Sequence, residues 1–159
     1  MKLVLISLLI ACVLAVGFNN STIHHNLNEF CKADGSPYVL LNNPTAADTT
    51  IVEVTKFIEA YDSQKYPFND LPRACGFCAE NLHNVSESKG IRCAIVISPT
   101  ISHCFNAFSV NNRMIYIDST GGQSTIALKK NGLYEVTRDI DGCIQTQLLG
   151  NEKDFVVFW

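Results

Sequence analysis

Two stretches of the chain repeat their apolar residues at the spacing of an α-helix. In the first, Asp48 or Thr49 can cap a helix that runs to Tyr61. The second spans about Cys75–Lys89, and Gly90 follows at the position that a left-handed helix cap requires. The predicted inner face of the first helix comprises Ile51, Val54, Phe57, Ile58 and Tyr61, and that of the second Cys78, Ala79, Leu82, Val85 and Ser86. Both faces are expected to pack against a core.

After the second helix the pattern changes to short apolar runs that are typical of β-strands. Ile91–Ser98 is almost continuously apolar, which favours a strand buried on both faces. His103–Val110 and Met114–Asp118 are predicted to pair as a hairpin around a two-residue turn at Asn111-Asn112. Further strands are predicted at residues 124–128, 133–137, 143–148 and 154–159. Because two helices precede an antiparallel sheet, the sequence predicts the α+β class.

The segment before the first helix, Phe30–Thr50, contains a glycine and two prolines and is predicted to be mainly loop. Its one apolar run, Tyr38–Leu41, is predicted to form a short strand. The chain has 159 residues, which is enough for one domain but not for two separate cores. We therefore predict a single domain over residues 30–159.

Residues 1–18 differ from the rest, because one lysine is followed by the uncharged apolar run Leu3–Phe18. The run is slightly short for a bilayer span and suits a secretory signal peptide, with cleavage expected after Gly17. An uncleaved membrane anchor and a lipoprotein signal ending at Cys12 are alternatives. Residues 19–29 are predicted to form a loose polar linker. The sequence thus predicts an extracytoplasmic protein, secreted or anchored to the membrane by its N-terminal segment.

Composition narrows the choice of function. Hydrophobic residues make up 47% of the chain and charged residues 17%, which is too apolar for a disordered protein. Beyond residue 18 the chain is too polar for a polytopic membrane protein. The net charge is −3 and the sequence has no Lys/Arg cluster. We expect no nucleic-acid partner, because phosphate binding needs concentrated positive charge.

Six of the seven cysteines lie beyond the leader. In an oxidising compartment they can form disulfides, whose pairing the sequence leaves open. If Cys75 is a working thiol, however, the other five cannot all pair with one another. The six are Cys31, Cys75, Cys78, Cys93, Cys104 and Cys143.

Cys75 has the position that a nucleophilic cysteine needs. The thiolate is the reactive form, so the thiol pKa must fall from about 8.5 towards neutrality. Unpaired N–H groups at a helix N-terminus favour such an anion. Cys75 lies at the predicted start of the second helix, whereas Cys78 lies one turn inside it and the others lie in strands or loops. We therefore predict that Cys75 is the nucleophile.

His103 and Asp118 are predicted to complete a triad with Cys75. His103 begins one strand of the predicted hairpin and Asp118 ends the other. With a two-residue turn, Asp118 lies opposite His103 or Phe105, so both side chains project from the same face of the sheet. An imidazole held in this way can serve as the base for the thiol, while the carboxylate fixes its tautomer.

These residues resemble the core of the transglutaminase-like domain, a family within the papain-like thiol enzymes. The resemblance begins with a cysteine that opens a helix and a small residue one turn later, here Cys75 and Ala79, followed by Gly90-Ile91. It continues with His103-Cys104-Phe105 and closes with Asp118-Ser119-Thr120 at a strand end. It implies a papain-like fold in which the helix bearing the nucleophile packs on an antiparallel β-sheet.

The resemblance implies acyl transfer on a peptide or amide bond, either by hydrolysis, as in a peptidase or amidase, or by transamidation. Cys75 attacks the carbonyl, His103 acts as acid and then as base, and Asp118 stabilises the imidazolium. The backbone N–H of Cys75 is expected to serve as an oxyanion donor; the sequence does not identify the side chain that completes the oxyanion hole, for which Asn69 is a candidate. The mechanism needs no metal or organic cofactor, and its expected partner is a peptide or protein substrate.

Other interpretations use the same residues. Cys75-Gly-Phe-Cys78 is a CxxC motif at a helix start, which is typical of thiol–disulfide oxidoreductases. A zinc site from Cys93, His103 and both cysteines of this motif has irregular ligand spacing. A catalytically silent binding module on the same fold is a third alternative. Within the enzyme interpretation, Cys78 can trap Cys75 in a disulfide. His83, on the second helix, is expected to face solvent.

Overall fold

The computed structural model describes residues 30–62, 74–140 and 142–159. The predicted leader, the linker and Asn69 lie outside the described residues. The elements are α1 (Ile51–Asp62), α2 (Cys75–Ser88), β1 (Cys93–Ser98), η2 (Pro99–Ile101), β2 (His103–Val110), β3 (Arg113–Asp118), β4 (Thr125–Ile126), β5 (Leu128–Lys130), β6 (Leu133–Ile140), β7 (Cys143–Gly150), η3 (Glu152–Asp154) and β8 (Val156–Phe158). Within these ranges no helix has the length and apolar character needed to cross a membrane.

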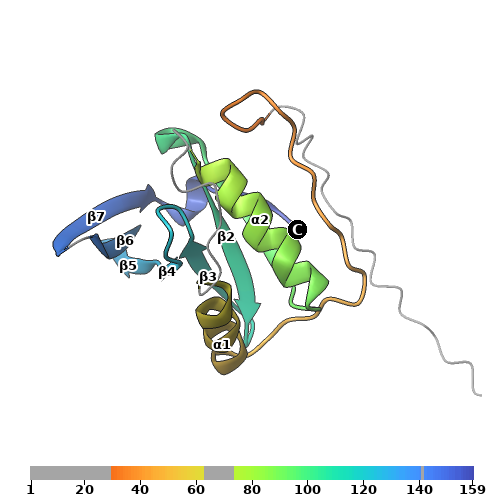
Figure 1. The fold of residues 1–159 in the computed structure, drawn as a ribbon. Helices are drawn as coiled ribbons and strands as arrows, with labels where there is room; N and C mark the ends of the chain where they lie inside the picture. Colours follow the sequence, from red (N-terminus) through yellow and green to blue (C-terminus); the bar gives the residue numbers. More distant parts are fainter. Residues whose placement is uncertain (1–29, 63–73, 141) are drawn as a thin grey trace, which may run out of the picture.

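The strands form two antiparallel sheets, and the helices cover one face of the larger sheet (Figure 1). The larger sheet has the strand order β4-β3-β2-β1-β8, and the smaller has the order β5-β6-β7. α2 packs on β1 and β2, while side chains of β6 and β7 pack against the opposite face of the larger sheet. This arrangement of helices and antiparallel sheets confirms the α+β class.

Side chains of β2 alternate between two cores, one on each face of the larger sheet. Phe108 packs with Leu82 of α2 and Val54 of α1 on the helical face. Phe105 packs with Val136 of β6 on the other face. All six residues of β1 are buried, which confirms the prediction of a strand covered on both faces. Each fully buried large apolar side chain contributes about 1.5–3 kcal/mol, so these two cores hold the three layers together.

Turn and capping residues decide where the elements begin. α1 begins after Thr50 rather than after the predicted caps Asp48 or Thr49, because Thr50 and Glu53 form a capping box. The Glu53 N–H donates to Thr50 Oγ1 at 3.3 Å, and the Thr50 N–H donates to Glu53 Oε2 at 2.9 Å. The pair Asn111-Asn112 has φ angles of 50° and 61°, as a type I′ hairpin turn requires. The predicted turn between β2 and β3 is thus confirmed, and it fixes their register.

Residues 30–49 form an extended segment beside α2, which we call the N-terminal strap (Figure 1). Within this described segment the predicted strand at Tyr38–Leu41 does not form, because its backbone bonds side chains of α2 instead of another strand. Asn84 accepts from the Leu41 N–H at 2.7 Å and donates to the Val39 carbonyl at 2.8 Å. The strap is therefore fixed to the helix by polar contacts.

His83 is buried, which corrects the expectation that it faces solvent. It is 2% exposed, and its Nε2 lies 3.1 Å from the carbonyl oxygen of Leu41 in the strap. Burial lowers the pKa of this imidazole, which favours its neutral form. The strap covers the helix face that the sequence pattern alone assigned to water.

The C-terminal strands differ from the prediction in their bounds. The strand predicted at 124–128 is divided into β4 and β5, which belong to different sheets. The division falls at Ala127, which is buried and donates its N–H to the Tyr116 carbonyl at 2.8 Å. β6 and β7 extend past their predicted ends to Ile140 and Gly150, whereas β8 occupies only the middle of residues 154–159.

Candidate active site

Cys75 is the first residue of α2, as the sequence predicts. The helix begins without a side-chain cap. The Cys75 sulfur accepts hydrogen bonds from the backbone N–H groups of Gly76 and Cys104. Aligned N–H dipoles of this kind stabilise negative charge at a helix N-terminus. The side chain is partly exposed, so a reagent can reach the sulfur.

His103 and Asp118 meet across the β2–β3 hairpin. The register places Asp118 opposite Phe105 and diagonally from His103, which is one of the two predicted arrangements. His103 Nε2 lies 2.6 Å from Asp118 Oδ2, and the imidazole also forms a hydrogen bond with the Cys75 thiol. Because Nε2 bonds the carboxylate, Nδ1 is the ring nitrogen that remains for the sulfur. The structure thus brings all three predicted residues together.

The contacts between Cys75 and His103 favour the charged form of each. Burial opposes ionisation of Cys75, but the hydrogen bond to His103 and the charge on that imidazole lower the thiol pKa below its ordinary value. Burial also opposes charge on His103, yet its bonds to Asp118 and Cys75 raise the imidazole pKa to about 9. Both shifts move the pair towards a thiolate beside an imidazolium, which is the form in which a cysteine is nucleophilic.

Arg138 of β6 belongs to the site, although the sequence analysis did not identify it. Its guanidinium lies 2.9 Å from Asp118 Oδ2, and the Thr120 N–H donates to Asp118 Oδ1 at 2.8 Å. Burial opposes charge on Asp118, but His103, Arg138 and Thr120 together lower its pKa and keep it ionised. The sequence held a partial signal, because Arg138 follows the apolar Val136 by two positions and alternate residues of a strand lie on the same face.

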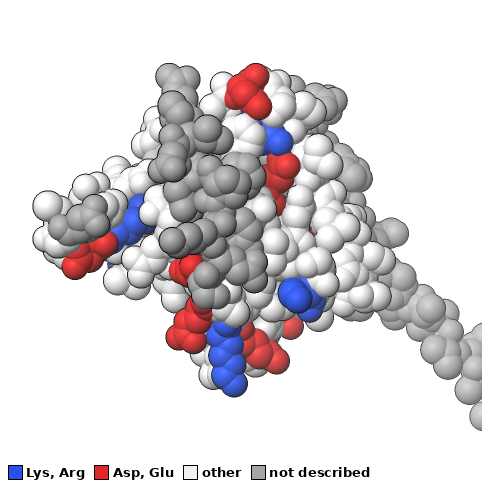
Figure 2. Space-filling view, in the orientation of Figure 1, with Lys and Arg blue, Asp and Glu red and all other residues white. Residues whose placement is uncertain are grey.

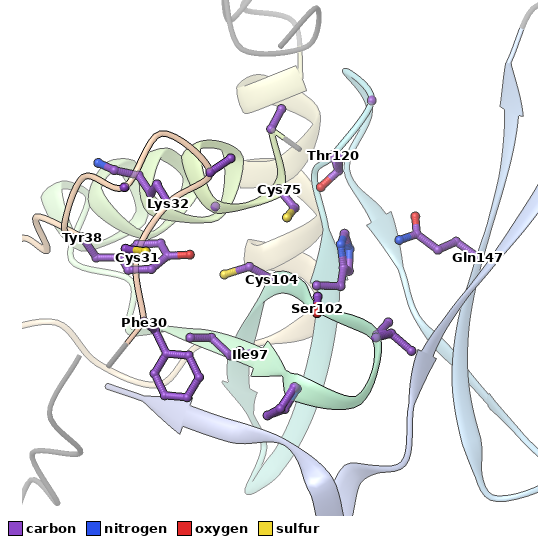
Figure 3. Close-up of a pocket in the computed structure, with 18 residues that line it drawn as sticks. Phe30, Cys31, Lys32, Tyr38, Cys75, Ile97, Ser102, Cys104, Thr120 and Gln147 are labelled. Atoms are coloured by element: carbon purple, nitrogen blue, oxygen red, sulfur yellow. The ribbon is translucent and has the colours of Figure 1, made fainter. Parts of the chain in front are cut away.

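Gln147 of β7 connects the smaller sheet to the same charges. Its Oε1 accepts a hydrogen bond from Arg138 Nη1 at 3.2 Å. Its side chain also lines the pocket that contains Cys75, on the same side of the sulfur as Thr120 (Figure 3). The sequence analysis assigned no functional role to this sheet, which in fact supplies two polar side chains to the site.

Cys75 and His103 line a pocket of about 990 Å³ (Figure 3). The N-terminal strap forms one wall, and η2 forms another. Lys32, which also lines the pocket, is paired with Glu80 at 2.7 Å, so its charge is neutralised within the fold. Much of the remaining lining is apolar or aromatic: Phe30, Tyr38, Ala74, Ile97, Pro99 and Ile101. A pocket of this size and lining can hold part of a peptide.

Three other cysteines are buried and lack the activation of Cys75. Burial raises the pKa of the Cys78 thiol to about 11. Burial also raises the pKa values of Cys93 and Cys104. Across the described ranges, the cysteine side chains are thiols that are not joined in disulfides. Cys75 is thus distinguished by electrostatics as well as by position.

Charged and metal-binding side chains bear on the alternative functions. In the part of the chain that the structure describes, no group of three or more His, Cys, Asp and Glu side chains is placed to hold a metal ion. Among the described residues that are visible in Figure 2, Lys and Arg are interspersed with Asp and Glu and form no continuous basic patch. The first of these observations gives no support to the zinc interpretation.

Comparison of the chain with protein-family models, with curated proteins and with solved structures finds no match. The function is therefore inferred from the fold and the site. They define an α+β protein in which a cysteine at a helix start, a histidine and an aspartate are connected by hydrogen bonds.

Proposed function

We propose that this protein is an exported papain-like thiol enzyme of the transglutaminase-like class, which transfers the acyl group of a peptide or amide bond through Cys75. One observation carries the proposal: His103 bonds the Cys75 thiol with one ring nitrogen and Asp118 with the other. A nucleophile, a base and an orienting carboxylate in that order are the requirements of nucleophilic catalysis. The resemblance over the same residues supports this assignment.

The first half-reaction forms a thioester. The Cys75 thiolate attacks the carbonyl carbon, and the carbonyl π electrons move to the oxygen to give a tetrahedral oxyanion. When this intermediate collapses, the C–N bond breaks and His103 donates its proton to the departing amine. Asp118 holds the imidazole in the required orientation, and Arg138 keeps Asp118 ionised.

The second half-reaction releases the acyl group. His103, now neutral, removes a proton from water or from an acceptor amine, which attacks the thioester carbonyl. Collapse of the second tetrahedral intermediate breaks the C–S bond and returns the thiolate beside the imidazolium. Water gives hydrolysis and an amine gives transamidation, so the two activities differ only in the acceptor. Neither half-reaction requires a metal or an organic cofactor.

Alkylation of the full chain by iodoacetamide tests the proposal, with each cysteine followed by peptide mass spectrometry. At pH 7 we expect Cys75 to react about tenfold faster than Cys143, an exposed thiol in the same chain. Because its pKa is lowered, the rate for Cys75 should reach its plateau at a lower pH than that of an ordinary thiol. In His103→Ala only the backbone N–H groups of Cys104 and Gly76 still oppose the effect of burial, so the thiol pKa rises, and each unit of rise slows the reaction at pH 7 about tenfold.

The control is His83→Ala, which removes a histidine that does not line the Cys75 pocket. It should leave the rate at Cys75 unchanged. Acylation by p-nitrophenyl acetate, followed as an acetyl group on the Cys75 peptide, extends the test to acyl transfer. The proposal is wrong if Cys75 reacts no faster than Cys143. It is also wrong if Cys75 is alkylated rapidly both in the wild type and in His103→Ala, and if the protein has a reductase activity that requires Cys78. That combination would identify an oxidoreductase.

A further inference from the structure

The hydroxyl group of Tyr38 lies beside the first turn of α2, although Tyr38 is far from Cys75 in the sequence. In Figure 3 the Tyr38 ring extends from the strap into the pocket, and its hydroxyl points towards Cys75 and Cys104. A Cβ atom placed on Gly76 would lie only 2.8 Å from the Tyr38 oxygen. The absence of a side chain at Gly76 is therefore what allows the phenol to sit next to the nucleophile.

The strap holds Tyr38 in this position from both sides. On one side Lys32 pairs with Glu80 of α2 at 2.7 Å. On the other, the Val39 N–H donates to the same Glu80 at 3.2 Å, and the Leu41 N–H donates to Asn84 at 2.7 Å. These contacts limit the rotation and displacement of the intervening chain. A fixed donor stabilises a developing charge better than a mobile one, because it needs no reorganisation during the reaction.

We propose that the Tyr38 hydroxyl binds the oxyanion of the tetrahedral intermediate, together with the backbone N–H of Cys75. The inference rests on the proposed acyl-transfer function. It assigns the second oxyanion donor to the strap rather than to Asn69, the candidate from the sequence.

The placement of the leaving group supports this assignment. The departing amine must face His103, which is held by Asp118 and, through it, by Arg138. Arg138 in turn bonds Gln147, so His103 and Gln147 are connected by one chain of polar contacts. Gln147 lies on the opposite side of Cys75 from Tyr38 (Figure 3). A carbonyl that directs its amine towards His103 therefore directs its oxygen away from that side, towards the Tyr38 hydroxyl.

The chemistry of the phenol suits the role. Burial and the neighbouring Cys104 raise the pKa of Tyr38, so the hydroxyl keeps its proton and remains a donor throughout the neutral range. In the resting site it forms a hydrogen bond with the Cys104 thiol. Sulfur is a weak acceptor, so exchanging it for a negatively charged oxygen is favourable.

The test compares two reactions of the same sulfur in Tyr38→Phe. Acylation by p-nitrophenyl acetate passes through an oxyanion, whereas alkylation by iodoacetamide is a direct displacement at carbon and forms none. We expect the variant to acylate roughly 10²- to 10³-fold more slowly, the usual effect of removing one oxyanion donor. Its alkylation rate should stay within about twofold of the wild type. Tyr61→Phe is the matched control, because it loses a phenol bond to Asn81 outside the pocket.

Gly76→Ala supplies an independent second variant. The new methyl group meets the Tyr38 oxygen at 2.8 Å, which forces the hydroxyl out of place. We expect slower acylation in this variant. In the Tyr38→Phe background the same methyl meets the nearest ring carbon at 3.5 Å, an ordinary contact. Its contact with Lys32 Cγ at 3.3 Å is the same in both backgrounds, so the part of the loss that comes from Tyr38 should disappear.

The outcomes separate this inference from the proposed function. If wild-type Cys75 is slow with both reagents, the acyl-transfer proposal fails. If the wild type is fast and Tyr38→Phe acylates at the wild-type rate, the oxyanion role of Tyr38 is overturned. An equal loss of acylation and alkylation also overturns it, because it means that Tyr38 only positions the thiol. If Tyr38→Phe does not fold, the Gly76→Ala variant decides the question. An acylation rate equal to that of the wild type in this variant overturns the assignment.

Discussion

Replacing Asp118 with asparagine is expected to slow acylation of Cys75 by roughly 10²- to 10⁴-fold. Both His103 Nε2 and Arg138 bond Oδ2 of Asp118, and the Thr120 N–H bonds Oδ1. All three neighbours are donors, so an amide with only one oxygen must direct its NH₂ group at one of them. The loss of negative charge also lowers the pKa of His103, which weakens the thiolate–imidazolium pair.

Stopped-flow acylation by p-nitrophenyl acetate measures this effect. Asp154→Asn is the matched control, since Asp154 is exposed and does not line the Cys75 pocket. It should acylate at the wild-type rate. A rate for Asp118→Asn within about threefold of the wild type would show that the carboxylate does not take part, and the assignment of the triad would then fail.

Replacing Arg138 with methionine is expected to destabilise the folded protein by about 3–5 kcal/mol. This is the usual effect of removing one partner from a buried ion pair, because the remaining charge stays buried. Asp118 is fully buried, and the Arg138 side chain is 7% exposed. Urea unfolding followed by far-UV circular dichroism measures the change in the free energy of unfolding.

Arg113→Met, at an exposed position of β3, is the matched control and should change stability by no more than about 0.5 kcal/mol. The double variant Arg138→Met/Asp118→Asn, which removes both charges, should be less destabilised than Arg138→Met alone. If Arg138→Met unfolds at the same urea concentration as the wild type, the ion pair has no structural role.

The substitution Arg138→Met should also change how the stability of the folded protein depends on pH. The folded-state pKa of Asp118 is lowered, so its contribution is present above its ordinary pKa and is lost as the pH falls through the folded value. Without Arg138 the folded pKa is higher. The contribution is then smaller, and acid unfolding of Arg138→Met should begin at a higher pH than that of the wild type.

The sequence was sufficient for the parts of the site that depend on local geometry. The start of α2 at Cys75 and the hairpin that brings His103 to Asp118 both follow from patterns within a few residues. A two-residue turn leaves only two registers for Asp118, and either one places it on the same face as His103. These predictions concern position, while the catalytic roles remain proposals.

The sequence was not sufficient for contacts between distant segments. Arg138 meets Asp118 only because the smaller sheet packs on the face opposite the helices, and no local pattern predicts how two sheets pack. The strap was assigned a strand because Tyr38–Leu41 is apolar. Its backbone instead bonds polar side chains of α2, which also explains why His83 was wrongly placed in solvent.

The ion pair between Asp118 and Arg138 has a consequence for folding. The two charges lie on strands of different sheets, and each is buried against the other. Burying the carboxylate before the smaller sheet has packed would leave it without its guanidinium, which is costly. The two sheets are therefore expected to form and unfold together rather than one after the other.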